Sequence, residues 1–511
     1  MAPSDEAPER LAVIDLGSNS FRLVVFSWVP GGWWKRTDEI FEAVRIGEGL
    51  ETTGILQPEP MERALETIEL YAHFCRATGI DHVRPVATSA IRDAANQGEF
   101  LQRAHERSGL EVEVLSRDDE ARYGYLAAVN STTLADGVAL DLGGGSMQLT
   151  RVAGRLAVDM QSWPMGAVRM TERFLPDGPA KPKRLKTLRA YVRDELASVP
   201  WLEGAGSNGG RIAGIGGTVR NLAAAAQLAA GLPSYGVQGF RLERGALDDL
   251  VERLAALPPD ERGRIPGIKP ERGDLILAGA VVIQTVMEAG GFDELEASEA
   301  GLREGIFYST LLAGADPPLF EDVRHAAVLN LAAQYHADWA HTRHVAWLTL
   351  DVWDALGRAG AHAADPAERE LLWAAAMVHD IGMTIDYDDH HKHSRYLVLN
   401  ASLPGFSTRE SALIGQIARY HRKGNPGLGE FARLARPGDE ALLVRCAAVL
   451  RVAEQLERSR DQTVRGVDVA VNGDVLLRLH SGEDTSVARW AAQRQAEVFR
   501  RAFGRELVVS D

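Results

Sequence analysis

The first 300 residues alternate between short apolar runs and longer amphipathic stretches. Residues 11–16 and 22–29 are apolar, β-branched runs on either side of Gly-Ser-Asn-Ser, which predicts two strands joined by a tight polar turn. Residues 59–77 carry apolar side chains three and four positions apart and predict an amphipathic helix. Strand-like runs at 83–90 and 111–116 each precede another helical stretch. This alternation predicts an α/β fold.

The strand–turn–strand pattern occurs a second time, at residues 137–152. Asp15 and Asp141 then hold the same place in two similar units, each just before a turn rich in glycine and serine. A third glycine turn, within residues 212–225, leads from a short apolar strand into an alanine-rich helix. Such an internal duplication predicts two lobes with a cleft between them.

The composition changes after Asp316, Pro317 and Pro318. Residues 319–465 are rich in helix formers and have almost no strand signal. Residues 467–480 are β-like, and Asn472-Gly473 is a suitable hairpin turn. We therefore expect one lobe in residues 1–130, a second in 131–314, and a mostly helical domain with a short β tail in 315–511.

Bulk composition adds few constraints. The chain has 511 residues, 45% apolar and 25% charged, which is typical of a globular protein of several domains. Its two cysteines, Cys75 and Cys446, are far apart, so neither a disulfide framework nor a thiolate zinc site is expected. The first ten residues are polar and acidic, unlike a secretory signal, and no segment approaches the roughly 20 apolar residues of a membrane span. These features predict a soluble, cytoplasmic protein with no membrane partner.

The net charge of −15 opposes the approach of an anionic ligand, and we expect no nucleic-acid partner. A polyanion would have to meet a metal ion or a local cluster of basic residues. Two such clusters occur, although a solvated helix face is the favoured interpretation of the first: Lys181, Lys183, Arg184, Lys186 and Arg189, and Arg419, His421, Arg422 and Lys423.

The three glycine turns predict phosphate-binding loops. Glycine lets backbone N–H groups converge on an anion, and serine, threonine and asparagine add further donors. One such loop would be weak support, whereas three in one chain, two of them after an aspartate at a strand end, favour phosphate binding. The candidate residues are Gly17, Ser18, Asn19 and Ser20, then Gly143, Gly144, Gly145 and Ser146, then Gly216, Gly217 and Thr218.

Charged residues near these turns complete a candidate site. Asp15 and Asp141 suit a Mg²⁺ ion, with Mn²⁺ as an alternative, unless they only satisfy turn amides. Arg22 and Arg92 suit neutralisation of phosphate charge, or are ordinary structural arginines. Residues 118–120 are Asp-Asp-Glu at an expected helix start, where acids also suit the helix dipole. Crowding of these three carboxylates is expected to raise one pKa and create a general base.

Six ordered motifs resemble the exopolyphosphatase and guanosine pentaphosphate phosphatase family. They are IDLGSNSFRLVV, ATSAIRDAAN, SRDDEAR, LDLGGGSMQL, GIGGTVRNLA and SEAGLREG, between residues 11 and 312. The resemblance implies two actin-like (RNase H-like) lobes. It assigns the general base to Glu120 and the metal and phosphate surroundings to Asp15 and Asp141. It makes Arg92 a phosphate contact, and it suggests a homodimer.

One residue departs from the family pattern within the second loop. The family usually has glutamate two positions after the serine, where this chain has Gln148. An amide oxygen is a weaker metal ligand than a carboxylate, so Gln148 is at most a weak part of the metal site.

The helical part resembles an HD-type domain, carried by HADWAHTRHVAWL, AAMVHDIGM, HHKHSRYLVLNASLPGF and ARYHRKG. His344, His379 and Asp380 fit three of its four metal ligands, and Glu454 stands where aspartate is expected. A metal site is one interpretation, and a degenerate domain is the other. In the second case His390, His391, His393, His421 and Lys423 would contact phosphate rather than metal.

The leading hypothesis is an exopolyphosphatase that releases terminal phosphate from inorganic polyphosphate. Guanosine pentaphosphate is the alternative substrate, and the loop motifs do not separate the two. A sugar-kinase-like ATP-dependent transferase and a non-catalytic sensor of polyphosphate or alarmone are alternatives from other classes.

Overall fold

The structure is a computed structural model that describes residues 7–175 and 180–510. The first six residues of the polar N-terminal stretch lie outside the described residues. The described chain divides into two compact units, the N-terminal unit of residues 7–323 and the C-terminal unit of residues 324–510.

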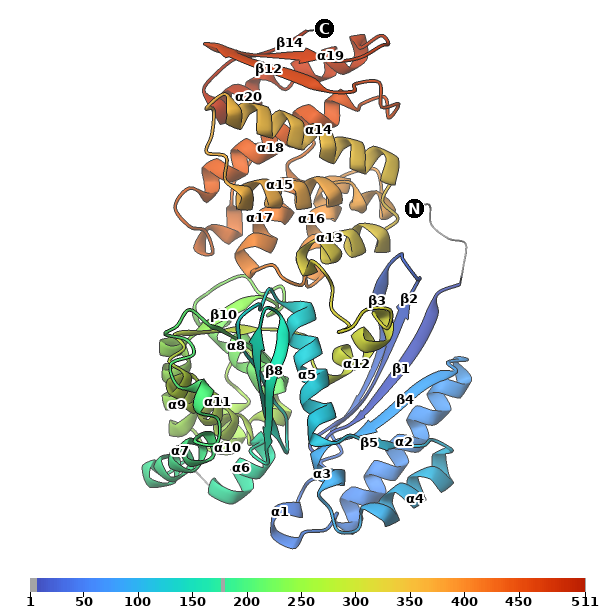
Figure 1. Cartoon of the computed structure of the whole chain (residues 1–511), viewed down its shortest axis with the longest axis vertical. Helices are drawn as coiled ribbons and strands as arrows, with labels where there is room; N and C mark the ends of the chain where they lie inside the picture. Colours follow the sequence, from blue (N-terminus) through green and yellow to red (C-terminus); the bar gives the residue numbers. More distant parts are fainter. Residues whose placement is uncertain (1–6, 176–179, 511) are drawn as a thin grey trace. The chain divides into compact units, whose positions relative to one another are not determined.

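Two mixed β-sheets form the framework of the N-terminal unit (Figure 1). Sheet A has the order β3-β2-β1-β4-β5, with β1 Glu9–Leu16, β2 Phe21–Trp28, β3 Trp34–Glu42, β4 His82–Ala87 and β5 Glu113–Val114. Sheet B has the order β10-β11-β9-β6-β7-β8, with β6 Gly137–Leu142, β7 Met147–Ala153, β8 Leu156–Trp163, β9 Arg211–Ile215, β10 Phe240–Glu243 and β11 Glu294–Ala297.

The two sheets repeat one arrangement, which confirms the predicted duplication. In sheet A, β1 pairs antiparallel with β2 and parallel with β4. In sheet B, β6 pairs antiparallel with β7 and parallel with β9. Asp15 lies opposite Arg22, and Asp141 lies opposite Gln148, so these pairs are equivalent in the two lobes.

Helices cover the sheets and fill the space between them. Those of the N-terminal unit are α1 Leu50–Thr53, α2 Pro58–Ala77, α3 Ser89–Arg92, α4 Gln97–Ser108, α5 Arg117–Ser131, α6 Ala167–Phe174, α7 Pro182–Leu196, α8 Gly217–Ala229, α9 Arg244–Ala256, α10 Pro259–Arg262, α11 Ile276–Gly290 and α12 Leu302–Leu311. Helices α5 and α12 pack against each other between the sheets (Figure 1). They share one apolar core with residues of β1 and β6, including Val13, Ala139 and Phe307.

The central strands explain why the first apolar runs were recognisable. In β1, residues Leu11–Ile14 are all buried because helices pack on both faces of sheet A, so the strand reads as a continuous apolar run. Strand β3 was not predicted. It lies at the edge of sheet A, and its sequence WKRTDEIFE is mostly exposed and polar.

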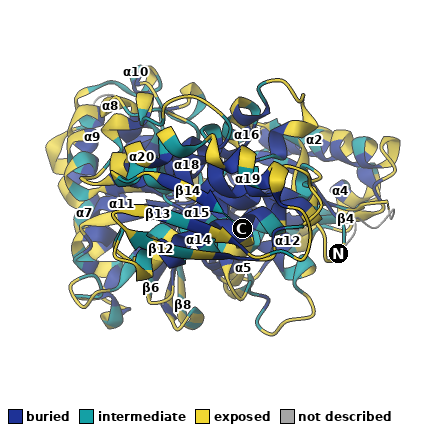
Figure 2. Cartoon of the chain, turned by 90° about the horizontal axis from the view of Figure 1, so that it is seen from above, coloured by how far each residue is buried: buried dark blue, intermediate teal, exposed yellow. Residues whose placement is uncertain are grey.

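The C-terminal unit is an apolar-cored helical bundle followed by a small sheet. Its helices are α13 Val323–Gln334, α14 Trp339–Arg358, α15 Pro366–Val378, α16 His390–Asn400, α17 Thr408–Arg419, α18 Asp439–Leu456, α19 Ser486–Gln493 and α20 Ala496–Phe503. Figure 2 shows buried residues along α14, α15 and α18, which form the centre of this core.

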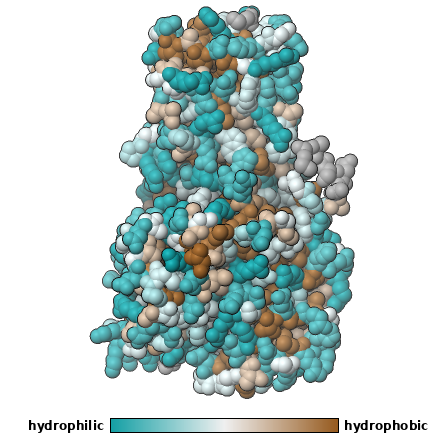
Figure 3. Space-filling view, viewed as in Figure 1, coloured by the Kyte–Doolittle hydropathy of each residue, from teal (hydrophilic) through white to brown (hydrophobic). Residues whose placement is uncertain are grey.

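Strands β12 Val467–Asn472 and β13 Asp474–Leu479 form the predicted hairpin, with Gly473 at its turn at a φ of 88°. Strand β14 Leu507–Ser510 adds to β13 in parallel and was not predicted. Apolar surface gathers over this C-terminal sheet (Figure 3), and Val487, Trp490 and Val508 in this part of the chain are exposed.

None of the helices in residues 7–175 and 180–510 has the length and apolar character needed to cross a membrane.

Candidate active site

A cavity of about 120 Å³ lies where the two lobes of the N-terminal unit face each other. The carboxyl ends of the parallel strands β1, β4, β6 and β9 lead into it, because parallel strands end at the same edge of a sheet. Most of the residues predicted from the sequence line this cavity: Asp15, Gly17, Ser18, Asn19, Ser20, Arg22, Glu120, Asp141, Gly143, Gly144, Gly145, Ser146, Gly216 and Gly217.

The loop of residues 143–146 lies close to Ser18 and Ser89 of the first lobe because Gly145 has no side chain. Ser18 Oγ lies 3.1 Å from Ser89 Oγ, within hydrogen-bonding distance. A Cβ atom on Gly145 would lie 2.6 Å from Ser18 Oγ and closer still to Ser89 Oγ. The approach of the two lobes at the cavity therefore depends on glycine at this position.

Glu120 is buried at the start of α5, with 7% of its surface exposed. Ser116 caps this helix by accepting a hydrogen bond from the Asp119 backbone N–H at 3.0 Å. Ser146 Oγ donates to Glu120 Oε1 at 2.8 Å, and Arg92 Nη1 donates to Glu120 Oε2 at 2.8 Å. The carboxylate is thus held on both oxygens, one by each lobe.

Arg92 lies beside Glu120 and outside the cavity lining. Its Nη1 also donates to the backbone oxygen of Leu115 at 3.0 Å, and Arg92 is not among the cavity-lining residues. Arg92 thus bonds the carboxylate of Glu120 and does not line the cavity, a placement that suits a positioning residue better than a phosphate contact.

The carboxylates that crowd one another come from different strands. Asp118 is exposed, and Asp119 accepts a hydrogen bond from Ser116 Oγ at 2.6 Å, so the expected crowding within residues 118–120 is absent. Burial, and then the nearby charge of Glu120, raises the pKa of Asp141 to about 7. Burial also raises the pKa of Asp15, although Arg303 and Arg22 oppose this.

Asp15 and Asp141 fit a Mg²⁺ site. Both carboxylates line the cavity, and no other described residue donates a hydrogen bond to either of them. A divalent ion would offset the cost of keeping two ionised acids in this buried place, and Mg²⁺ characteristically binds one or two carboxylates together with water and phosphate oxygens. The donor set therefore suits the ion.

Gln148 does not join this set. Its amide Nε2 donates to Ser162 Oγ on β8 at 3.2 Å, and it is absent from the cavity lining. Thr218 is likewise outside the lining, because its side chain packs against α11, where a Cβ on Gly279 would lie 2.7 Å from Thr218 Cγ2.

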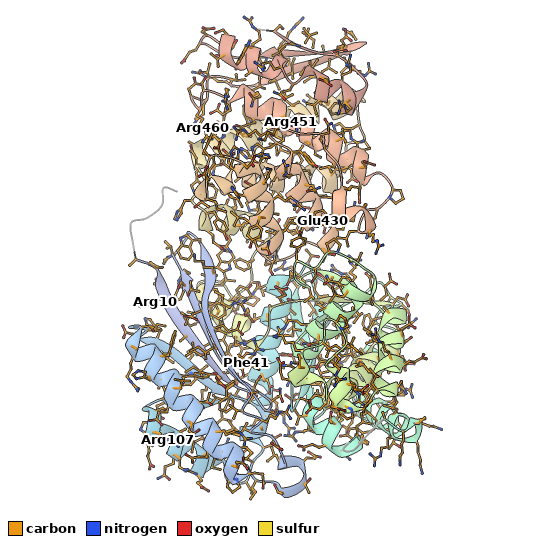
Figure 4. The ribbon with its side chains drawn as sticks, turned by 180° about the vertical axis from the view of Figure 1, so that it is seen from behind. Arg10, Phe41, Arg107, Glu430, Arg451 and Arg460 are labelled. Carbon is orange, nitrogen blue, oxygen red and sulfur yellow. The ribbon has the colours of Figure 1, made fainter. Side chains whose placement is uncertain are left out.

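Four arginines supply the positive charge of the cavity: Arg22, Arg220, Arg272 and Arg303. Of these, only Arg22 was predicted. Its Nη1 donates to Glu39 Oε1 at 2.6 Å, and its guanidinium lies over the ring of Phe41, labelled in Figure 4, at 4.7 Å. Burial lowers the pKa of Arg220 and of Arg272 to about 10, so both still carry charge at neutral pH.

Arg303 has buried guanidinium N–H groups that its described neighbours leave free to bind a ligand. Its side chain is 7% exposed, and its Nε and Nη1 atoms are buried without a hydrogen bond from the described residues. Asp15 Oδ2 lies 3.9 Å from Arg303 Nε. Arg303 and Arg220 belong to the SEAGLREG and GIGGTVRNLA motifs, which could have indicated them. Arg272 lies in a charged loop that gave no such signal.

In the C-terminal unit the structure brings together three of the four expected ligands. His379, Asp380 and Glu454 converge, whereas His344 does not join them. His344 Nε2 instead lies 2.9 Å from the backbone oxygen of Val464. His341, one turn earlier on α14, takes its place, with Nε2 3.1 Å from Glu454 Oε2.

Comparison with known proteins agrees with this architecture. Residues 31–313 match the family described as "Ppx/GppA phosphatase family", and residues 323–478 match "Ppx/GppA phosphatase, domain III". A solved Ppx/GppA family member from Aquifex aeolicus is 30% identical, with a TM-score of 0.52, and the match covers 60% of this chain and 99% of that one.

Two further solved structures share the fold. An exopolyphosphatase from Cytophaga hutchinsonii is 24% identical with a TM-score of 0.55, and the match covers 59% of this chain and 98% of that one. An exopolyphosphatase-like protein is 28% identical with a TM-score of 0.54, covering 60% of this chain and all of that one.

The two repeated lobes and the phosphate loops at their junction define an actin-like phosphatase. The chain belongs to the Ppx/GppA phosphatase family, as its motifs predicted.

Proposed function

We propose that this phosphatase is an exopolyphosphatase, which hydrolyses the terminal phosphoanhydride bond of inorganic polyphosphate. The observation that carries the proposal is the cavity itself, in which four arginines and three glycine-containing loops face a glutamate fixed on both oxygens. The arginines outnumber the three acids Asp15, Glu120 and Asp141, so the cavity is locally positive despite a chain charge of −15.

In the proposed reaction, loop N–H groups and arginines bind the oxygens of the terminal phosphoryl group. Glu120 accepts a proton from a water molecule, whose oxygen forms a bond to the terminal phosphorus. The bond from that phosphorus to the bridging oxygen breaks, and the shortened chain leaves with the bridging oxygen. Positioning and charge stabilisation supply most of the catalysis, as is general for phosphoryl transfer.

Mg²⁺ held by Asp15 and Asp141 would neutralise charge on the phosphate oxygens, and Mn²⁺ could replace it. Arg92 and Ser146 keep the Glu120 carboxylate in one orientation, so that its remaining lone pairs are directed toward the water molecule in each catalytic cycle.

The lining of the cavity favours inorganic polyphosphate over a nucleotide. No phenylalanine, tyrosine or tryptophan is among its described lining residues, so nothing there stacks a guanine or adenine base. This observation supports polyphosphate over guanosine pentaphosphate, and it also argues against a transferase that uses ATP.

The test is phosphate release by the purified chain with Mg²⁺ from long polyphosphate, guanosine pentaphosphate and ATP, measured in parallel. We expect the highest kcat/KM with polyphosphate. A higher value with guanosine pentaphosphate would reassign the substrate. Turnover that requires ATP and an acceptor would indicate a transferase, and tight polyphosphate binding without release would indicate a sensor.

A further inference from the structure

The interior of the C-terminal unit contains a polar cluster that the proposed phosphatase reaction does not use. Four histidines and two carboxylates from five places in the chain meet there, and most of their surface is buried. His341 comes from α14, His379 and Asp380 from the end of α15, and His390 from the start of α16. His421 follows α17, and Glu454 belongs to α18.

Three of these histidines are oriented by backbone carbonyls. Nδ1 of His379 lies 2.6 Å from the oxygen of Ala376, Nδ1 of His421 lies 2.7 Å from that of Ala418, and Nδ1 of His390 lies 2.8 Å from that of Tyr387. A carbonyl oxygen only accepts, so each Nδ1 carries the proton. A second hydrogen bond of this kind is typical of metal-binding histidines, and it directs Nε2 of each ring into the cluster.

The Nε2 atoms point at one another and at Asp380. Nε2 of His390 lies 3.0 Å from Nε2 of His421. With Nδ1 of each ring bonded to a carbonyl, Nε2 is the nitrogen that each ring presents to the cluster. Asp380 Oδ1 lies 3.3 Å from Nε2 of His390 and 3.5 Å from Nε2 of His421. These three atoms are all metal-ligand atoms, and they lie close enough together to share one ion.

Asp380 also lies near a second group of ligands, His341, His379 and Glu454. Asp380 Oδ2 lies 3.7 Å from Nε2 of His341, and Asp380 Oδ1 lies 3.7 Å from Nε2 of His379. Glu454 Oε2 lies 3.1 Å from Nε2 of His341 and 3.2 Å from Nε2 of His379. His341 is 2% exposed, and its Nδ1 makes no hydrogen bond with a described residue.

These spacings suit metal coordination. Ligands about 2.0–2.2 Å from one ion at tetrahedral or octahedral angles are roughly 3.0–3.5 Å apart, close to the separations observed. The longer side chain of Glu454 still reaches both histidines, so glutamate in place of aspartate does not remove the fourth ligand.

We propose that the C-terminal unit binds two divalent transition-metal ions that share the carboxylate of Asp380. His341, His379 and Glu454 complete the site of one ion, and His390 and His421 complete the site of the other. Imidazole-rich donors favour Mn²⁺, Fe²⁺, Co²⁺ or Zn²⁺ over Mg²⁺. His390 and His421, expected to contact phosphate if the domain were degenerate, are metal ligands in this assignment.

Arg460 forms an ion pair with Asp380 at the partly exposed edge of the cluster. Arg460, labelled in Figure 4, follows α18, and its side chain is 41% exposed. Its Nη2 donates to Asp380 Oδ2 at 2.8 Å. Arg460 thereby neutralises the shared carboxylate when no ion is present, and it must release that oxygen when the ion at His341 binds.

The experiment measures bound metal in the untagged full-length chain. The protein is treated with a chelator, incubated separately with Fe²⁺, Co²⁺ or Zn²⁺ in excess Mg²⁺, freed of excess ion, and analysed by inductively coupled plasma mass spectrometry. The excess Mg²⁺ keeps the site of Asp15 and Asp141 occupied, and Mg²⁺ is counted apart from the transition metal. We expect two ions per chain with at least one of these metals, and loss of both in Asp380→Asn. His344→Ala, changed on the same helix as His341 but outside the cluster, is the matched control and should keep both.

Further variants separate the two ions and the two units. His341→Ala and His390→Ala should each keep one ion, and circular dichroism checks that every variant is folded. Asp141→Asn should keep both, because Asp141 belongs to the other unit, so a failure of the Mg²⁺ assignment there leaves this result unchanged. Only trace metal in the unmodified folded chain, or full retention in folded Asp380→Asn, would overturn the proposal.

Discussion

Glu120 is the residue whose surroundings most constrain the chemistry. One of its oxygens accepts from Ser146 of lobe II and the other from Arg92 of lobe I, so its orientation depends on both lobes. A carboxylate fixed in this way needs little reorganisation before it accepts a proton, which is the advantage of a preorganised base.

Arg92 is therefore expected to act through Glu120. Arg92→Lys should lower kcat for polyphosphate hydrolysis by about 10- to 100-fold and leave KM within roughly a factor of three, because it loosens the base without removing a substrate contact. Steady-state kinetics measures the two parameters separately.

Arg117→Lys is the matched control for Arg92→Lys, since Arg117 is 54% exposed at the start of α5, the helix that carries Glu120, and should keep the kcat of the unmodified chain. A large rise in KM for Arg92→Lys with kcat preserved would return Arg92 to the role of phosphate contact.

Asp141 makes the metal-free fold sensitive to pH. Its folded pKa of about 7 lies above the ordinary value of 3.8, so between these limits the folded chain holds a proton that the unfolded chain has lost. Stability therefore falls as pH rises across this window, and the decline is complete above pH 7.

Asp141→Asn should remove that decline. In the presence of a chelator we expect the variant to be more stable than the unmodified chain by about 1–3 kcal/mol at pH 8, and to differ little near pH 4. Thermal unfolding across this pH range tests the expectation, with the exposed Asp118→Asn as control. A pH profile that is the same in the Asp141 variant and the unmodified chain would count against a buried, protonated Asp141.

At the scale of elements, the loops that bring the lobes together depend on the absence of a Cβ. Gly145→Ala should destabilise the N-terminal unit by about 1–3 kcal/mol and lower activity, because the new methyl group meets Ser18 and Ser89. Chemical unfolding and phosphate release measure the two effects.

Gly98→Ala provides the comparison for Gly145. Gly98 is in helix α4, and a Cβ there meets nothing within 4 Å, so alanine should stabilise the helix by roughly 0.5–1 kcal/mol. If alanine at Gly145 lowered the free energy of unfolding no more than alanine at Gly98, close contact between the lobes at this loop would not be needed for stability.

The elements also show which parts of the fold were readable from the sequence. The buried strands β1 and β6 were recognisable because both their faces are covered, and the repeated aspartate before a glycine turn revealed the duplication. The edge strands β3 and β8 were not recognisable, because many of their residues are exposed and polar. Each of them is held in its sheet by pairing with a single neighbouring strand.

The sequence predicted those residues of the candidate site that lie in short contiguous motifs. The glycine loops and Glu120 lie in short motifs, and most of these residues line the cavity. Arg272 comes from a loop without a pattern, and only the three-dimensional fold brings it to Gly217. His341 and His344 are one turn apart on α14, so the sequence alone could not decide which of them faces Asp380.

At the scale of the whole molecule, the local charge of the cavity differs in sign from the net charge of the chain. The chain carries −15, yet four arginines meet at one cavity in the N-terminal unit, and the C-terminal unit collects imidazoles around one carboxylate. Each unit has its own donor chemistry, oxygen-rich in the first and nitrogen-rich in the second, so the two are expected to select different ions.

The account depends on Glu120 as the base that activates water in the arginine-lined cavity. The most direct measurement is the rate of phosphate release from saturating polyphosphate with Mg²⁺ by Glu120→Gln and by the unmodified chain, with polyphosphate affinity measured alongside. We predict a loss of about 10²- to 10⁴-fold in kcat with affinity largely retained. A variant that keeps most of the activity of the unmodified chain would contradict the account.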